Sequence, residues 1–296
     1  HTRYGTVTGV QTCALPISLV DAFAATTRPV VIGAKTFTEQ YILSEILAGQ
    51  VRRRIGLPTR AVQSLGSTVA FDALRAGEID VYVDYSGTIW ATVMQRSDPP
   101  RPRERVKREV ARFLRDEHGI EVAAALGFEN AYALGMLASR ARELGISRIA
   151  ELARVAPGLE IGGDYEFFQR AEWAALVSAY GLRFRRQRSM DSSLMYQAVD
   201  RGEVDVISAF STDGRIAALD IALLEDERGV IPPYDAIVLA RPLLAQEQPQ
   251  VIEALSGLLG RIRAEDMRRM NLAVDRDGRA PAEVAREFLA GLRSGP

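Results

Sequence analysis

Residues 71–81 read FDALRAGEIDV, and residues 196–206 read YQAVDRGEVDV. An offset of 125 residues aligns these two segments without a gap, and it gives eleven identities in 32 positions when stretches 55–86 and 180–211 are compared. Repetition at this level indicates that the chain uses one structural unit twice. Each copy predicts a helix that ends at a glycine and leads into an apolar strand.

Each copy is also preceded by a strand and a helix. The first pair is predicted at Val30–Ala34 and Tyr41–Arg54, and the second at Leu159–Gly163 and Phe167–Tyr180. Strands that alternate with helices in this way form layered α/β units. The sequence therefore predicts an α/β fold with two β-α-β-α-β lobes.

The segments outside the repeat predict how the lobes are joined. We expect the chain to cross between lobes near Phe128–Ala133 and again near Pro232–Ala236, and the helical segments of Val251–Leu292 to pack back on the first lobe. Two lobes joined by two strands enclose a cleft that can close by a hinge motion. The predicted domains are residues 28–129 with 236–296 for lobe 1 and 130–235 for lobe 2.

Residues 1–27 are predicted to lie outside the fold. Residues 7–17 read VTGVQTCALPI, which looks like a translated sequencing adapter, and Ala22-Phe23-Ala24 has the small-x-small pattern that closes a secretory signal. We therefore expect an adapter-like leader followed by the remnant of a signal peptide, and an exported protein.

Composition excludes several classes of function. The 37 basic and 38 acidic residues nearly cancel, so no overall field attracts nucleic acid. His1, His118 and Cys13 are too few and too scattered for a Cys/His metal site, and Cys13 has no disulfide partner. The chain also lacks a GxxxxGK phosphate loop. We expect no metal, no catalytic residues and no nucleic-acid partner.

Six motifs occur in one order along the chain. They are IGAKTFTEQYIL (Ile32–Leu43), LGSTVAFDAL (Leu65–Leu74), GEIDVYVDYSGT (Gly77–Thr88), FENAYAL (Phe128–Leu134), LMYQAVDRGEVDVISAFSTDGRI (Leu194–Ile216) and PPYDA (Pro232–Ala236). The ordered set resembles the substrate-binding proteins of osmoprotectant ABC importers. The resemblance implies a type II periplasmic-binding-protein fold, export from the cytoplasm, no cofactor, and delivery of a trimethylammonium compound to a permease and its ATPase. We expect a periplasmic or extracytoplasmic monomer, either free or anchored to the membrane.

The same resemblance nominates the ligand-binding residues. It implies an aromatic cage made by Tyr85, Tyr132, Phe210 and Tyr234. It also implies polar contacts from Gln40, Thr88 and Asn130. Tyrosine is common in relatives at the position of Phe210, and phenylalanine keeps the ring face but removes the hydroxyl.

The chemistry of the residues agrees with this nomination. A quaternary ammonium carries no N–H donor, so it is recognised by aromatic faces, which are apolar and carry a negative quadrupole. The 125-residue offset independently pairs Tyr85 with Phe210. Because open α/β sheets bind ligands at strand ends, these two rings are predicted to face each other across the cleft.

Other interpretations of these residues stay open from the sequence. Gln40 could complete a helix cap with Thr36 or Thr38, and Thr88 could be only a turn residue. Asp80 and Asp205 are interpreted as structural residues that accept hydrogen bonds from local backbone donors, and not as an acid/base pair.

Two alternative functions use the same scaffold. Two-lobed α/β proteins also include enzymes and effector-sensing regulatory domains, so the fold does not decide between them. Trp90 and Trp173 are predicted to belong to the core, and Lys35 either reaches a ligand carboxylate or faces solvent.

Overall fold

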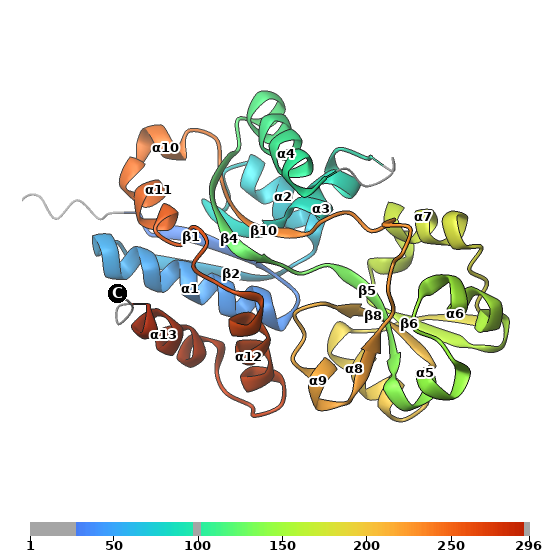
Figure 1. The fold of residues 1–296 in the computed structure, drawn as a ribbon. Coiled ribbons are helices and arrows are strands. Elements are labelled where there is room, and N and C mark those ends of the chain that lie inside the picture. The colour runs from blue at the N-terminus through green and yellow to red at the C-terminus, as the bar shows by residue number, and fades with distance from the viewer. Residues whose placement is uncertain (1–27, 97–101, 293–296) are drawn as a thin grey trace, which may run out of the picture.

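Two five-stranded mixed sheets form two lobes (Figure 1). The computed structural model describes residues 28–96 and 102–292, so the predicted leader at residues 1–27 lies outside the described residues. The chain leaves the first sheet after Glu129, enters the second at Tyr132, and returns to the first at Asp235. The predicted α/β class and the two crossings between lobes are confirmed.

The first sheet has the order β2-β1-β3-β10-β4. Its strands are β1 (Val30–Lys35), β2 (Thr59–Leu65), β3 (Val81–Tyr85), β4 (Glu121–Glu129) and β10 (Asp235–Ala240). The helical segments of this lobe are α1 (Thr38–Ile55), α2 (Ser67–Arg75), α3 (Ser86–Thr88), the π-helical η1 (Ile89–Val93), α4 (Arg103–His118), α10 (Leu244–Glu247), α11 (Pro249–Ser256), α12 (Ala264–Asp275) and α13 (Pro281–Gly291).

The second sheet has the order β7-β6-β8-β5-β9. Its strands are β5 (Tyr132–Leu137), β6 (Glu160–Gly163), β7 (Arg186–Ser189), β8 (Val206–Phe210) and β9 (Ile221–Leu223). Its helical segments are α5 (Ala138–Leu144), α6 (Ile149–Val155), η2 (Ala156–Gly158), η3 (Phe167–Gln169), α7 (Ala171–Tyr180), α8 (Ser192–Asp200) and α9 (Arg215–Ala218).

The internal repeat is visible in the element bounds. Helix α8 begins and ends 125 residues after α2, and β8 begins and ends 125 residues after β3. The turns between them pass through Gly77 and Gly202, which have φ of 75° and 68°. Glycine adopts this left-handed conformation without the strain that a Cβ would add. The duplicated helix-turn-strand unit predicted from the sequence is therefore confirmed.

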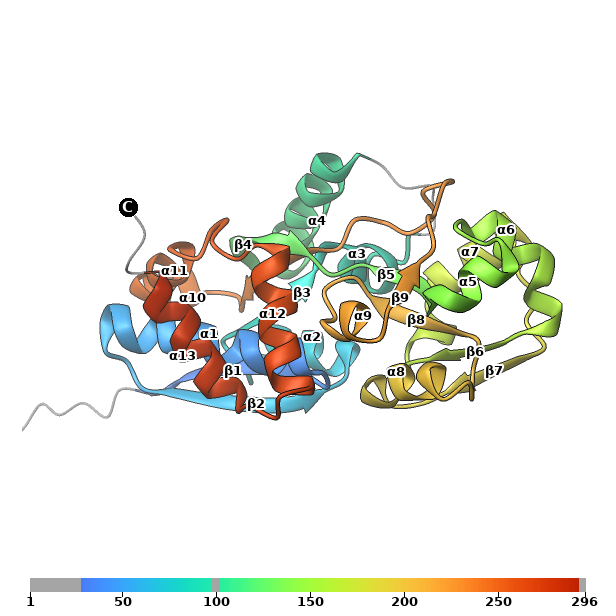
Figure 2. The same ribbon diagram turned by 60° about the horizontal axis from the view of Figure 1, so that its bottom comes forward.

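The C-terminal helices cover the first lobe. Helix α1 contacts α11, α12 and α13, and Figure 2 shows α12 and α13 beside α1. The core prediction is also confirmed for Trp90 and Trp173, which are both buried. None of the helices in the described ranges combines the length and the apolarity needed to cross a membrane.

One predicted helix begins later than expected. The sequence predicts a helix over Phe167–Tyr180, but a short 3-10 turn ends at Gln169, and α7 starts at Ala171. Arg170 lies between them with extended backbone angles, φ −81° and ψ 150°. The break frees the Arg170 side chain from the helix and lets it reach the space between the lobes.

The buried aspartates of the repeat are bonded differently from the prediction. Asp80 accepts hydrogen bonds from the backbone of Val31 at 2.7 Å and from the guanidinium of Arg241 at 2.6 Å. Asp205 accepts one from the backbone of Glu160 at 2.8 Å. The predicted structural role fits, but the prediction of local donors was wrong, because each carboxylate bonds across the sheet to a neighbouring strand.

These two aspartates form a matched pair for a stability experiment. Asp80→Ala removes one of the two carboxylates that pair with Arg241, the other being Glu247, and it also removes the acceptor of the Val31 backbone. One charge-assisted bond and one backbone bond are lost, so we expect the free energy of unfolding to fall by about 3 kcal/mol. Asp205→Ala removes one backbone acceptor, with an expected loss of about 1 kcal/mol. Urea denaturation measures both, and equal losses would contradict the assigned ion pair.

Candidate ligand-binding site

A cavity of about 270 Å³ lies between the lobes. We call it the ring cavity, because aromatic side chains from both lobes line it. Its aromatic lining residues are Phe37, Tyr85, Tyr132, Tyr165 and Phe210. Its charged lining residues are Lys35, Asp164, Glu166, Arg170 and Asp191. The cavity therefore offers apolar faces and charges of both signs.

The rings form a connected series. Phe37 stacks on Phe210 with centroids 5.6 Å apart and planes 9° apart, and its centroid lies 6.3 Å from that of Tyr85. Tyr132 is tilted against Phe210 at 5.1 Å, and the two residues are register partners on β5 and β8. The structure thus brings Tyr85, Tyr132 and Phe210 together at the ends of three strands.

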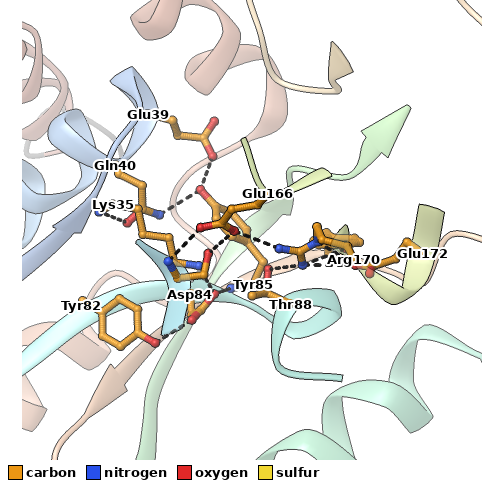
Figure 3. A network of polar contacts seen from close by, with 12 residues as sticks. Lys35, Glu39, Gln40, Tyr82, Asp84, Tyr85, Thr88, Glu166, Arg170 and Glu172 are labelled. Carbon is orange, nitrogen blue, oxygen red and sulfur yellow. Dashed lines mark hydrogen bonds and ion pairs between the residues drawn. The ribbon is translucent and has the colours of Figure 1, made fainter. Parts of the chain in front are cut away.

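The hydroxyl of Tyr85 is fixed by two neighbours on α1 (Figure 3). It donates to Glu39 at 2.6 Å and accepts from the amide of Gln40 at 3.1 Å. Gln40 is buried, and the residues that line the ring cavity do not include it. In this geometry Gln40 orients Tyr85 from behind, whereas Thr88 and Asn130 do line the cavity.

Tyr234 lies behind Tyr132. Its ring meets that of Tyr132 edge-on at 5.9 Å and 83°, and its hydroxyl donates to Glu172. Tyr234 also packs on Gly87, where an added Cβ would lie 2.5 Å from the ring. The residues that line the ring cavity do not include Tyr234, so the structure places it as a support for Tyr132.

Two buried cations enter the ring cavity. Lys35 Nζ lies 2.5 Å from Asp84 and 5.5 Å from the centre of the Tyr85 ring. The Arg170 guanidinium lies 3.1 Å from Glu172 and 5.2 Å from the centre of the Tyr132 ring. Each cation is held by a buried carboxylate while it lies over one of the aromatic faces.

Hydrogen bonds join the lobes beside this cavity. The backbone and hydroxyl of Ser67 donate to Glu166 at 3.0 and 2.8 Å, and Arg170 donates to Thr88 at 3.4 Å. Burial alone would raise the pKa of Glu166, but the bonds from Ser67 together with the positive charges of Lys35 and Arg170 lower that pKa. The lobes are therefore in direct polar contact across the cleft.

Glu39 is the most heavily bonded carboxylate of the site. Besides Tyr85, its donors are Asn130 at 3.0 Å, Thr212 at 2.5 Å and Asn271 at 3.0 Å. These donors come from β3, a lobe crossing, the second lobe and α12. Burial raises the pKa of Glu39, and the four hydrogen bonds oppose that shift.

Comparison with known proteins decides the family. A sequence profile described as the substrate binding domain of ABC-type glycine betaine transport systems matches residues 28–291. The chain belongs to this family. Its members are transport binding proteins, which agrees with the resemblance found in the six sequence motifs.

Curated relatives extend the family assignment. The glycine-betaine-binding protein of Pseudomonas aeruginosa is 30% identical over 273 residues, covering 87% of this chain and 86% of the relative. The carnitine transport binding protein of Listeria monocytogenes is 29% identical, covering 87% and 85%. The ergothioneine transport permease/ergothioneine binding protein of Helicobacter pylori is 28% identical over 93% of this chain, which spans only 49% of that longer protein.

A solved structure of a similar protein supports the fold assigned to this chain. A crystal structure of a glycine betaine/carnitine/choline ABC transporter protein superposes with a TM-score of 0.74 at 29% identity, covering 89% of this chain and 98% of the other. The predicted type II binding-protein fold is confirmed. Within the described residues no cluster of three or more His, Cys, Asp or Glu side chains is placed to hold a metal.

Three site residues of this binding protein were not predicted as ligand-binding or bridging groups. Phe37 lies inside the quoted KTFTEQ motif, so its aromatic character was an available signal. Arg170 was hidden in a predicted helix interior, and only the helix break exposes its role. Glu39 looked like an ordinary first-turn acid of α1, because its partners are remote in sequence.

Replacing Glu39 gives a pH test of this buried carboxylate. Because burial raises the folded-state pKa above its unfolded value near 4.5, the stability that Glu39 contributes is fully present below about pH 4.5. That contribution is lost as pH rises through the folded pKa. The quantity to follow is the free energy of unfolding of the wild type minus that of Glu39→Gln. We expect this difference to decrease as the pH rises from acid to neutral. Urea denaturation at a series of pH values measures it, and a constant difference would count against a raised pKa.

Proposed function

We propose that the protein captures a zwitterionic quaternary ammonium compound in the ring cavity and delivers it to an ABC permease and its ATPase. The observation that carries the proposal is that Tyr85, Tyr132 and Phe210 line the same cavity between the lobes as Lys35 and Arg170. Rings suit a methylated cation, and the two protein cations suit a carboxylate.

The cationic end of the ligand is proposed to lie nearest Phe210. Lys35 already stands over Tyr85, and Arg170 over Tyr132, whereas Phe210 is flanked by the rings of Phe37 and Tyr132. Positive charges repel, so the quaternary nitrogen favours the part of the cavity farthest from the two protein cations. The carboxylate end then lies beside Lys35 and Arg170.

The relatives support the chemical class of the ligand. They are named for glycine betaine, carnitine and ergothioneine, which are all zwitterions with a trimethylammonium group. We therefore propose this class, with glycine betaine and carnitine preferred over choline, which lacks a carboxylate. The proposed site also includes Thr88 and Asn130, which line the cavity. It includes Tyr234 and Gln40 as supports of the rings.

The proposal also covers the working state of the protein. We propose a monomer outside the cytoplasm that binds and releases its ligand without converting it. We assign residues 28–129 and 236–296 to lobe 1 and residues 130–235 to lobe 2. The two lobes close over the ligand by bending at the two crossings. The polar contacts of Ser67 with Glu166 and of Thr88 with Arg170 support closure at this cleft.

The ring requirement is tested at Phe210. Phe210→Leu keeps an apolar side chain but removes the aromatic face, so we expect the affinity for glycine betaine to fall about tenfold, equivalent to about 1.4 kcal/mol. Phe210→Tyr keeps the face and is the matched control, with an affinity close to wild type. Isothermal titration calorimetry measures both. Equal affinities in the Leu and Tyr variants would remove Phe210 from the cage.

The carboxylate requirement is tested at Lys35. Lys35→Gln removes the charge but keeps a donor beside Asp84, which also accepts from Tyr82 and from the Tyr85 backbone. We expect the affinity for glycine betaine to fall about tenfold, as for loss of one charge-assisted bond of about 1.5 kcal/mol. Choline binding should not weaken, which also shows that the variant is folded. Equal losses for both ligands would contradict the proposed orientation.

A further inference from the structure

The two helices that begin at the ring cavity start in different ways. Helices α2 and α8 are equivalent in the internal repeat, and the residues that precede their first turns are Gly66 and Asp191. Asp191 caps its own helix, because its carboxylate accepts from the backbone and the hydroxyl of Ser193 at 2.8 and 2.6 Å. Gly66 has no side chain that could do the same. Helix α2 therefore has no cap of its own.

Glu166 of the second lobe supplies a carboxylate at this position. It accepts from the backbone and the hydroxyl of Ser67, the first residue of α2, at 3.0 and 2.8 Å. Asp191 uses the same two groups of one serine at the start of α8. A Cβ added to Gly66 would lie 3.8 Å from Oε1 of Glu166. The carboxylate of Glu166 thus lies beside the space that a side chain at position 66 would occupy.

A carboxylate stabilises the start of a helix in two ways. It satisfies a backbone N–H group that has no partner inside the helix, and its charge interacts favourably with the positive end of the helix dipole. Helix α8 has both contributions in every arrangement of the lobes, since Asp191 directly precedes it. Helix α2 gains them only when the second lobe lies against the first. Capping of α2 therefore favours closure of the lobes.

The segment that carries Glu166 also forms part of the wall of the ring cavity. The backbone of Glu166 donates to Asp164 at 2.9 Å, and Arg170 donates to the carboxylate of Glu166 at 3.2 Å (Figure 3). Asp164 and Arg170 both line the ring cavity, and the Arg170 guanidinium lies over Tyr132. Capping of α2 and placement of this part of the wall thus depend on the same short segment.

We propose that Glu166 is a positioning residue that holds the lobes together by capping α2 across the cleft, and that the glycine at position 66 makes this capping depend on closure. The inference rests on the proposed function, since it concerns closure of the lobes over a ligand in the ring cavity. The cap forms as the lobes close and breaks before they open. It therefore slows the release of any ligand of the cavity, whether or not that ligand carries a carboxylate.

Ser67→Pro tests the cap without removing the glutamate. Proline lacks both groups that donate to Glu166, and it is tolerated as the first residue of a helix after an extended residue, here Gly66 with φ −67° and ψ 159°. We expect glycine betaine and choline each to dissociate about tenfold faster from this variant. Association rates should stay close to wild type, because the cap acts after the lobes close. Stopped-flow fluorescence measures both rates.

Glu166→Ala gives a second test of the same bond. We expect it to speed dissociation of both ligands about tenfold, and the double variant with Ser67→Pro to release them no faster than either single variant. Ser192→Pro is the matched control, because it makes the same change at the equivalent position of α8, which Asp191 caps. Its effect on dissociation, of whatever size, should be equal with and without Glu166.

The outcomes separate the cap from the proposed function. Effects of Ser67→Pro and Glu166→Ala that multiply in the double variant would overturn the cap, since each change would then act independently. Faster release of only one of the two ligands would also overturn it, because a direct contact with the ligand would be the cause. Both results leave the proposed function intact. Failure of the wild-type protein to bind either ligand would overturn both.

Discussion

The buried carboxylate of Glu39 is the interaction on which the arrangement of the site depends. Its four side-chain donors belong to segments that are far apart in the sequence, including Thr212 of the second lobe and Asn271 of α12. A carboxylate removed from water needs such bonds, because burial without them is very costly. The requirement to satisfy this one group therefore fixes Tyr85, a lobe crossing and both lobes relative to each other.

The same constraint explains why the two halves of the repeat are no longer equivalent. Tyr85 and Phe210 occupy matching strand ends, but only Tyr85 has a hydroxyl, and that hydroxyl is held by Glu39 and Gln40. Phe210 is held by stacking on Phe37 and by contact with Tyr132. The first lobe thus presents a ring fixed by directional bonds, whereas the second presents a ring fixed by packing alone.

Sequence reasoning recovered most of the scaffold but only part of the site. The repeat located α2, β3, α8 and β8, because glycine stops and apolar periodicity are local signals. Tyr85, Tyr132 and Phe210 were nominated by motifs and do line one cavity. Arg170 was missed because its position depends on a helix break, and Gln40 and Tyr234 were expected at the cavity wall because a motif does not show the direction of a side chain.

The buried ion pairs explain how one cavity can serve a ligand with two poles. Lys35 and Arg170 would repel a quaternary nitrogen if they were free, but Asp84 and Glu172 hold them in fixed positions against Tyr85 and Tyr132. Breaking a buried pair is costly, so these cations stay at their end of the cavity. In the proposed complex this anchoring separates the end that attracts a carboxylate from the end at Phe210 that accepts a methylated cation. Specificity for a zwitterion then follows from the fixed spacing of the charges and rings, and not from the strength of any one contact.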